Sequence, residues 1–327
     1  MIEALLIDKE QGARQTTARF ATLPDTAVAD DEATLDGAMV RVAWSSLNYK
    51  DALAITGRAP VVRRFPMVPG IDLAGTRSAD GRAVLATGFG LGERYWGGLA
   101  TQARVPDDWL IPIPPPLSVR QAMAIGTAGF TALLCLEALE AHGVTPASGP
   151  VVVSGASGGV GSIAVMLLAR LGYDVAAMTG RPAEESFLTG LGARRIVARA
   201  EYEQPGKPLA AEEWAAAIDV AGGHVLANLC ARLRPGGVVA ACGLAGGMDL
   251  PASVAPFILR GITLAGIDSV HCPVARRAGV WARLATLLDP AQLDAMTSEV
   301  AFADVIAAAH DLLEGRLRWR VVVRLPA

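Results

Sequence analysis

The feature that most constrains the fold is a glycine-rich turn between an apolar strand and an apolar helix. It reads Gly155-Ala156-Ser157-Gly158-Gly159-Val160-Gly161 and joins a strand expected at 151–154 to a helix expected at 159–171. Glycines are needed there because side chains would block both the tight turn and the approach of a pyrophosphate to the helix N-terminus. The segment predicts a dinucleotide site, with a purely structural turn as the alternative.

Strands and helices alternate on either side of this turn. The apolar pattern predicts strands at 151–154, 174–178, 196–197, 215–219, 237–241 and 262–267, and helices at 119–139, 159–171, 183–191 and 224–233. Strands that alternate with helices of this length form βαβ units, whose parallel sheet is covered on both faces. The fold class is therefore α/β, with a Rossmann-like doubly wound sheet.

The first third of the chain has a different pattern, in which short β-type runs such as 39–44 and 84–86 alternate with Gly and Pro. This favours a compact, mostly β domain. After Asp268 the sequence predicts amphipathic helices at 273–288 and 302–314 and a last strand at 319–325. A lone strand needs a sheet to join, so we expect it to return to the N-terminal domain. The predicted domains are 1–120, 121–268 and a returning segment 269–327.

Length and charge exclude several classes of protein. The 327 residues suffice for two domains, and a net charge of −3 argues against a nucleic-acid partner. The N-terminus lacks the basic start and apolar stretch of a signal peptide, which predicts a cytoplasmic protein. The uncharged segment 150–169 carries the glycine cluster, so we interpret it as buried strand and helix rather than a membrane span.

The end of the second strand indicates which dinucleotide is bound. An NAD site usually has Asp or Glu there to accept hydrogen bonds from the ribose hydroxyls. This strand ends Met178-Thr179-Gly180-Arg181, with no acid. Arg181 can pair with a 2′-phosphate and Thr179 can donate to it, while Arg194 and Arg195 open the following strand and could reach the same pocket. We therefore predict NADPH, with solvated surface arginines as the alternative.

The sequence offers no metal site. The cysteines, which we expect to be reduced core thiols, and the histidines are scattered without ligand spacing; they are Cys135, Cys230, Cys242, Cys272, His142, His224, His271 and His310.

Several segments together resemble the medium-chain dehydrogenase/reductase superfamily, and most closely its zinc-free, quinone oxidoreductase-like branch of acrylyl-CoA reductases. They are Ser45-Ser46-Leu47-Asn48-Tyr49-Lys50-Asp51, Pro69-Gly70-Ile71-Asp72-Leu73-Ala74-Gly75, Gly88-Phe89-Gly90, Trp96-Gly97-Gly98-Leu99-Ala100, Ile125-Gly126-Thr127-Ala128-Gly129-Phe130-Thr131-Ala132 and Cys242-Gly243-Leu244-Ala245-Gly246-Gly247. The resemblance covers nearly the whole chain. It implies a GroES-like β domain beside the Rossmann-like domain and an active site between them.

The resemblance also implies site residues. Tyr49 would line the nicotinamide end; the pyrophosphate would contact Ser157, Gly158, Gly159 and Val160; the 2′-phosphate would contact Thr179, Gly180, Arg181 and Arg195; Leu244 and Ile258 would contact the nicotinamide through their backbones. The Cys and Gly-His-Glu ligands of zinc-dependent relatives are missing from the N-terminal domain. Relatives often carry Gly-Arg before the last strand, where this chain has Trp319-Arg320, so a cofactor role for Arg320 is in doubt.

Without zinc, hydride transfer is easiest onto an alkene activated by conjugation, such as an α,β-unsaturated thioester. Tyr49 is the candidate for a hydrogen-bond donor near the substrate, although it could equally be a packing residue. Lys50 and Asp51 are expected to be structural, as an ion pair. Arg58, Arg63 and Arg64 could meet the phosphates of a CoA ester, or could form a solvated basic loop.

Three functions stay open, in the order NADPH-dependent acrylyl-CoA reductase, NADPH:quinone or enone reductase, and non-catalytic NADPH-binding protein.

The apolar strand 262–267 is predicted at a sheet edge. Pairing of that edge with its copy in a second subunit would form a homodimer, whereas cover by the helix at 273–288 would leave a monomer.

Overall fold

The computed structural model describes residues 1–9, 16–27 and 36–327. These residues form two compact units. Met1–Thr127 and Val270–Ala327 make up one, which we call the split unit; Ala128–Ser269 make up the other, which we call the inserted unit.

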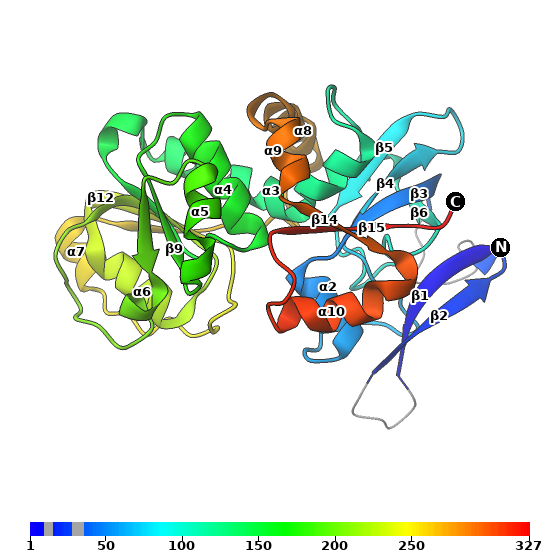
Figure 1. Ribbon diagram of the computed structural model, residues 1–327, viewed down its shortest axis with the longest axis horizontal. Helices are drawn as coiled ribbons and strands as arrows, with labels where there is room; N and C mark the ends of the chain where they lie inside the picture. Colours follow the sequence, from blue (N-terminus) through cyan, green and yellow to red (C-terminus); the bar gives the residue numbers. More distant parts are fainter. Residues whose placement is uncertain (10–15, 28–35) are drawn as a thin grey trace. The chain divides into compact units, whose positions relative to one another are not determined.

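The strands are β1 Ile2–Asp8, β2 Thr17–Leu23, β3 Ala38–Ser46, β4 Asp72–Arg77, β5 Ala83–Thr87, β6 Gln102–Val105, β7 Ile111–Pro112, β8 Val151–Val153, β9 Val175–Thr179, β10 Arg195–Ala198, β11 Trp214–Asp219, β12 Leu233–Ala241, β13 Thr263–Gly266, β14 Thr297–Ala301 and β15 Arg320–Arg324. The helices are α2 Tyr49–Thr56, α3 Val119–Ala141, α4 Gly159–Arg170, α5 Glu185–Gly190, α6 Gly223–Arg232, α7 Ala255–Arg260, α8 Val274–Leu287, α9 Pro290–Ala295 and α10 Val305–Leu313 (Figure 1).

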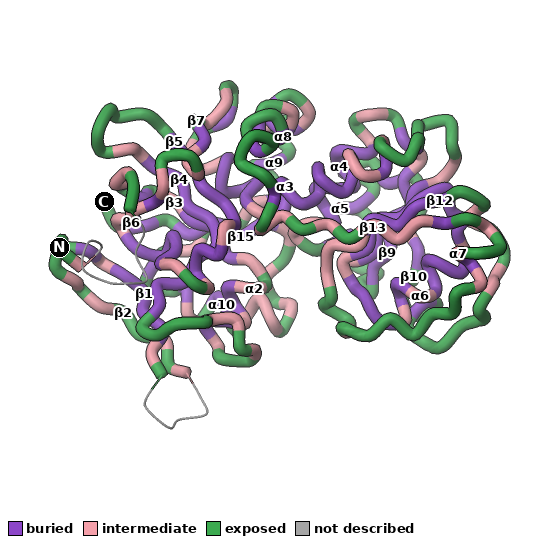
Figure 2. The backbone as a smooth tube through the Cα atoms, turned by 180° about the vertical axis from the view of Figure 1, so that it is seen from behind, coloured by how far each residue is buried: buried purple, intermediate pink, exposed green. Residues whose placement is uncertain are grey.

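The inserted unit contains a parallel sheet in the order β10-β9-β8-β11-β12-β13. Its central strands are continuous apolar runs that are buried along their length, as parallel strands covered on both faces require (Figure 2). This confirms the predicted doubly wound α/β sheet. The predicted edge position of β13 is also confirmed, because β12 is its neighbour on one side and the sheet ends on the other.

The order of the strands fixes where a ligand can bind. From β8 the chain runs outward to β9 and β10, and then returns to β11 on the other side of β8. In such sheets the ligand lies outside the carboxyl ends of the strands at the point where the order reverses. That point lies between β8 and β11, directly above the glycine-rich turn.

The split unit is built on a mixed sheet in the order β14-β15-β3-β4-β5-β7, with β6 also paired to β3. β15 pairs antiparallel with β3, so residues 320–324 lie in the sheet of the N-terminal segment. The two parts of the chain share one apolar core, in which Val40 and Leu73 pack with Val321 and Val323.

Beyond residue 150, the sequence analysis missed two α-helices and one strand. α7 is a short helix whose second residue is Pro256; α9 and β14 lie between the two predicted C-terminal helices. β14 is mostly exposed and has a polar sequence, so only its parallel pairing with β15 identifies it as a strand.

Helix α3 connects the units and is long and apolar enough to cross a membrane, but 83% of its most apolar stretch is buried within the structure. Such burial is typical of a core helix. At Gly126 the backbone leaves the helical conformation, with φ 50° and ψ −159°, one residue before the chain passes from the split unit to the inserted unit.

Candidate functional site

The glycine-rich turn has the geometry of a phosphate cradle. Gly155 has φ +56°, and a Cβ there would lie 2.4 Å from Cγ2 of Val220. A Cβ on Gly161 would lie 2.3 Å from the carbonyl oxygen of Gly155. The turn therefore excludes side chains at both positions. It leads into α4 with Gly158 as the N-cap, so the first backbone N–H groups of the helix can receive a pyrophosphate.

The end of β9 lies beside this cradle. The hydroxyl oxygens of Ser157 and Thr179 are 3.2 Å apart, and the Arg181 backbone N–H donates to Thr179 at 3.1 Å. Thr179 is buried, whereas Gly180 and Arg181 are exposed. The segment that would contact a 2′-phosphate is thus joined through side chains to the segment that would contact the pyrophosphate.

The arginines near β9 lie at different distances from the end of that strand. Arg195 lies level with Ala176, three residues before Thr179, which is about 10 Å along the strand. Its guanidinium pairs with Glu213 at 3.3 Å and lies 4.3 Å from the centre of the Trp214 ring.

Arg199, which the sequence analysis did not single out, follows β10 at the level of Thr179. Its guanidinium would lie 2.7 Å from a Cβ added at Gly180, and Glu203 holds its Nε at 2.6 Å. Arg199 therefore lies closer to the Thr179-Gly180-Arg181 segment than Arg195 does.

The predicted contacts for the nicotinamide lie on exposed segments of the inserted unit. Leu244 follows β12 and is 56% exposed; Ile258 belongs to α7 and is 73% exposed. Both follow the carboxyl end of β12, the edge of the sheet at which the glycine-rich turn also lies.

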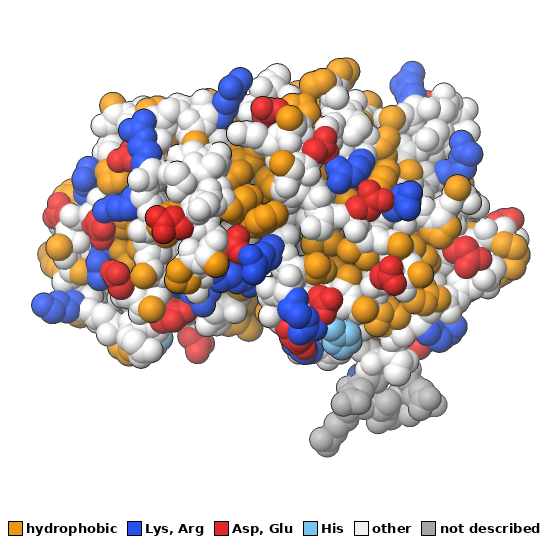
Figure 3. All heavy atoms as spheres, viewed as in Figure 1, with side chains coloured by type: hydrophobic (Ala, Val, Ile, Leu, Met, Phe, Trp, Pro, Cys, Tyr) orange, Lys and Arg blue, Asp and Glu red, His pale blue; other side chains and the backbone are white. Residues whose placement is uncertain are grey.

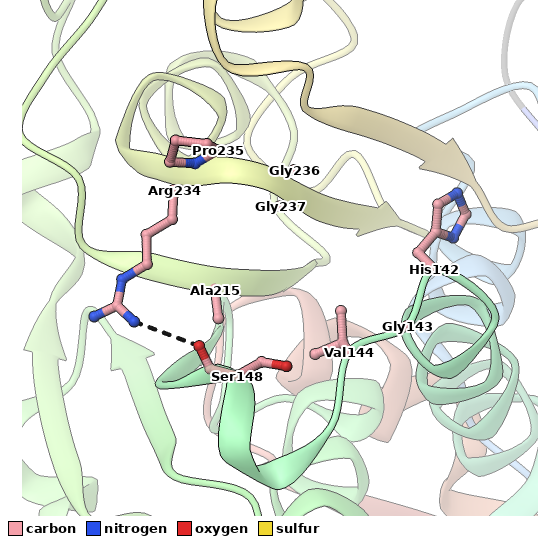
Figure 4. Close-up of a pocket in the computed structure, with 9 residues that line it drawn as sticks. All are labelled: His142, Gly143, Val144, Ser148, Ala215, Arg234, Pro235, Gly236 and Gly237. Atoms are coloured by element: carbon pink, nitrogen blue, oxygen red, sulfur yellow. Dashed lines mark hydrogen bonds between the residues drawn. The ribbon is translucent and has the colours of Figure 1, made fainter.

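A hollow of about 190 Å³ lies at the opposite edge of this sheet (Figure 4). His142, Ala215 and Gly237 line it, and Arg234 donates to the Ser148 carbonyl beside it. Because Ala215 and Gly237 precede the carboxyl ends of their strands, this hollow is separate from the dinucleotide site.

In the split unit, Tyr49 begins α2 and is 49% exposed. Asn48 is the N-cap of the helix, and its backbone N–H donates to the Asp51 carboxylate at 2.9 Å. The predicted ion pair between Lys50 and Asp51 is wrong. Lys50 pairs with Glu93 at 2.7 Å, because its side chain points to the surface while that of Asp51 turns into the core.

Beneath Tyr49 lies a group of buried polar side chains centred on Asp72. Its carboxylate accepts hydrogen bonds from the hydroxyls of Ser46 and Thr127, from the Asn48 amide at 2.9 Å and from the Thr127 backbone N–H at 2.9 Å. Arg320, only 2% exposed, donates to Asn48 at 3.3 Å and to the carbonyl oxygens of residues 123 and 124. Arg320 thus anchors the base of the Tyr49 helix from within the split unit.

Burial changes the ionisation of this group. It raises the pKa of Asp51 to about 7, an effect that hydrogen bonds from Asn48 and Ile71 oppose and the neighbouring charge of Asp72 increases. Burial also lowers the pKa of Arg320 to about 10, against the attraction of Asp72 and Asp51. One buried cation therefore compensates two buried carboxyl groups.

The basic loop after α2 is exposed. Arg58 lies 3.5 Å from Glu314, and Arg63 and Arg64 are exposed. Beside this loop is a second hollow of about 220 Å³, lined among others by Lys9, Arg58 and Phe65. On the face drawn in Figure 3, basic and acidic side chains are interspersed over the surface.

Across residues 1–9, 16–27 and 36–327, no three His, Cys, Asp or Glu side chains gather as a metal site would require. The four cysteines are all free thiols, and Cys135, Cys230 and Cys272 are buried.

Comparisons with known proteins agree with this geometry. A family model described as zinc-binding dehydrogenase matches residues 159–286. An acrylyl-CoA reductase of Ruegeria pomeroyi is 47% identical over 100% of both chains. A putative quinone oxidoreductase of Bacillus subtilis is 45% identical over 89% of this chain and 91% of its own. The crystal structure of an oxidoreductase from Salmonella enterica in complex with NADP has a TM-score of 0.93 and 48% identity, and covers 99% of this chain and 100% of its own.

Proposed function

The chain belongs to the acrylyl-CoA reductases of the medium-chain dehydrogenase/reductase family, and from this membership we propose that it reduces the C=C bond of an α,β-unsaturated acyl-CoA with NADPH. The substrate that the proposal favours is acrylyl-CoA, which becomes propionyl-CoA without a metal ion. The observation that carries the proposal is the full-length similarity to an acrylyl-CoA reductase.

The bound cofactor supplies a hydride, which adds to Cβ of the substrate and leaves an enolate that takes a proton at Cα. The protein must orient the two reactants, stabilise the enolate oxygen and exclude water. We propose that the Tyr49 hydroxyl donates a hydrogen bond at the substrate; its 49% exposure at the start of α2 leaves it accessible for this role.

The residues present fit the cofactor. The cradle at Gly155 and Gly161, which a Cβ would fill, supports binding of the pyrophosphate by Ser157, Gly158, Gly159 and Val160. The absence of an acid at the end of β9 supports binding of the 2′-phosphate by Thr179, Gly180 and Arg181. We add Arg199 to this set and propose that Leu244 and Ile258 face the nicotinamide.

Arg199 and Arg195 are rival partners of the 2′-phosphate, and two alanine variants separate them. Arg199→Ala should raise the Michaelis constant for NADPH about 10-fold or more, because it removes one charged hydrogen bond to phosphate. Arg195→Ala should change it by no more than about twofold, since Glu213 and Trp214 already hold that guanidinium. Steady-state kinetics with NADPH and NADH measure both. A larger effect at Arg195 would return the assignment to that residue.

We propose that Arg58, Arg63 and Arg64 contact the phosphates of the CoA ester. The support is their charge and exposure beside the hollow at Lys9 and Phe65.

The proposed reaction is tested by comparing the specificity constants for acrylyl-CoA, crotonyl-CoA, a simple quinone and a simple enone, with NADPH oxidation as the readout. We expect acrylyl-CoA to exceed the quinone at least about tenfold, and activity to persist after exhaustive chelation. A higher specificity constant for the quinone would favour an NADPH:quinone reductase, which the similarity to a putative quinone oxidoreductase keeps as the second candidate. NADPH binding without turnover of any of the four would indicate a non-catalytic binding protein.

We further propose a homodimer that pairs β13 with its copy about a two-fold axis. The support is an edge strand, Thr263–Gly266, that contains no proline or charge. Leu264→Lys should give monomers or insoluble protein, whereas Ile196→Lys on β10, at the other edge of the sheet, should leave the dimer intact. Analytical ultracentrifugation measures both. Wild-type protein that sediments as a monomer at micromolar concentration would refute the dimer.

A cytoplasmic location is proposed as well, because four free cysteines fit a reducing compartment.

A further inference from the structure

We propose that Asp219 is a positioning residue that sets the distance between the pyrophosphate cradle and the loop that faces the nicotinamide. The inference rests on the proposed hydride transfer from NADPH. Asp219 ends β11, on the side of β8 opposite to β9, and its side chain is completely buried.

The Asp219 carboxylate organises the turn that follows its own strand. One oxygen accepts hydrogen bonds from the Ser154 hydroxyl at 2.6 Å and the Ala221 N–H at 3.3 Å; the other accepts from the Gly222 N–H at 2.8 Å. The Ser154 hydroxyl in turn accepts from the Val220 N–H at 2.9 Å. The backbone N–H groups of residues 220–222 are thus all held by this pair of side chains. Burial raises the pKa of Asp219 above its ordinary value, and these hydrogen bonds oppose part of that rise.

The turn carries the loop at residues 242–247. The Cys242 N–H donates to the Asp219 carbonyl at 2.9 Å, and the Gly246 N–H donates to the Ala221 carbonyl at 2.7 Å. Gly222 and Gly247 form a β-bridge. The loop and the turn are in such close contact that a Cβ on Gly243 would lie 2.4 Å from the Val220 carbonyl oxygen. The position of this loop therefore depends on the turn beneath it.

The same turn contacts the phosphate cradle. Val220 packs so closely on Gly155 that its Cγ2 atom occupies the place of a side chain there. Ser154 is the residue immediately before Gly155, and its backbone N–H donates to the Ile218 carbonyl at 2.9 Å. The hydrogen bond from Ser154 to Asp219 therefore joins the start of the cradle to the turn that supports the loop.

The direction of the cofactor follows from the sheet. With the pyrophosphate above β8 and the adenosine phosphate toward β9, the nicotinamide half must extend over β11 and β12. Leu244, half exposed on the supported loop, lies on that side. Displacement of the loop would move its backbone relative to the nicotinamide ring and spoil the alignment for hydride transfer, while the phosphate contacts remain.

The test uses the full-length Asp219→Asn variant with NADPH and acrylyl-CoA. The amide nitrogen of Asn would face a backbone N–H or the Ser154 hydroxyl, so at least one hydrogen bond is lost. We expect kcat to fall about 10- to 100-fold, as misplacement of reacting groups does. The dissociation constant of NADPH should change less than about threefold. The primary deuterium isotope effect on kcat, measured with 4-deuterated NADPH, should rise because hydride transfer becomes slower than product release.

Asn228→Ser is the matched control. Asn228 is buried in the same unit and donates at 2.8 Å to the carbonyl oxygens of Tyr202 and Gln204, in a different loop. The Asn228→Ser variant should have a lower thermal stability than the wild type but an unchanged isotope effect. Ser154→Ala serves if Asp219→Asn does not fold, and it should change kcat and the isotope effect in the same direction by a smaller amount.

An unchanged isotope effect and kcat in every folded variant at Asp219 and Ser154 would overturn the positioning role. A wild-type enzyme that does not reduce acrylyl-CoA would instead overturn the proposed function, so the two failures are distinguishable.

Discussion

We expect Arg181→Asp to raise the Michaelis constant for NADPH about 100-fold and to change that for NADH by less than about threefold. The substitution removes a cation from the exposed end of β9 and places a carboxylate where a 2′-phosphate would lie. For NADH the same carboxylate can accept hydrogen bonds from the ribose hydroxyls. Steady-state kinetics with both cofactors provide the measurement.

Arg170→Asp is the control for this experiment. Arg170 ends α4, whose glycine-rich N-terminus is the proposed pyrophosphate site, and a helix of 12 residues is about 18 Å long. The variant makes the same change of charge away from the 2′-phosphate, so both Michaelis constants should stay near those of the wild type. If NADPH and NADH respond alike to Arg181→Asp, the assignment of the 2′-phosphate to this residue is wrong.

The second large effect is expected on stability, at Arg320. Arg320→Met should lower the free energy of unfolding by about 3–5 kcal/mol, because it leaves buried carboxyl groups without their cation. Asn48 and the carbonyl oxygens of residues 123 and 124 would also lose a donor. Urea unfolding followed by circular dichroism measures the loss.

Arg324, on the same strand, provides the comparison. Its side chain is 64% exposed and pairs with Glu299 at 3.2 Å, so Arg324→Met should cost less than about 1 kcal/mol. Equal losses at the two positions would contradict the proposed stabilisation of Asp72 and Asp51 by Arg320.

The inserted unit could be predicted from the sequence because its signals are local. Its apolar strands are continuous runs. The turn at Gly155 to Gly161 lies between an apolar strand and an apolar helix, and this position indicates a dinucleotide-binding turn. The doubly wound sheet and the edge position of β13 followed from this pattern, since alternating strands and helices allow few arrangements.

Arg199 could not be found in the same way. Its proximity to Gly180 depends on the register between β10 and β9, which pairs Ala198 with Thr179. A shift of register would bring a different residue to that place, and no local pattern in the sequence determines the register of so short a strand.

The buried charges beneath Tyr49 were missed for a different reason. Charged residues are usually exposed, so Asp51 was assigned to an ion pair with its neighbour. The partners that allow its burial are far away in sequence. Ile71 is one of them, since its backbone N–H donates to the Asp51 carboxylate at 2.9 Å, and Arg320 arrives on the strand at residues 320–324.

The return of β15 to β3 has a consequence for the order in which a ribosome can produce a folded protein. Residues 128–269 are made as one uninterrupted segment, so every strand of the parallel sheet exists before residues 320–324 are made. The central strand of the split unit, by contrast, must wait for residues 320–324, and its buried acids wait equally long for Arg320. During synthesis the inserted unit can therefore fold first, while the segment that was made before it stays incomplete until residues 320–324 are released.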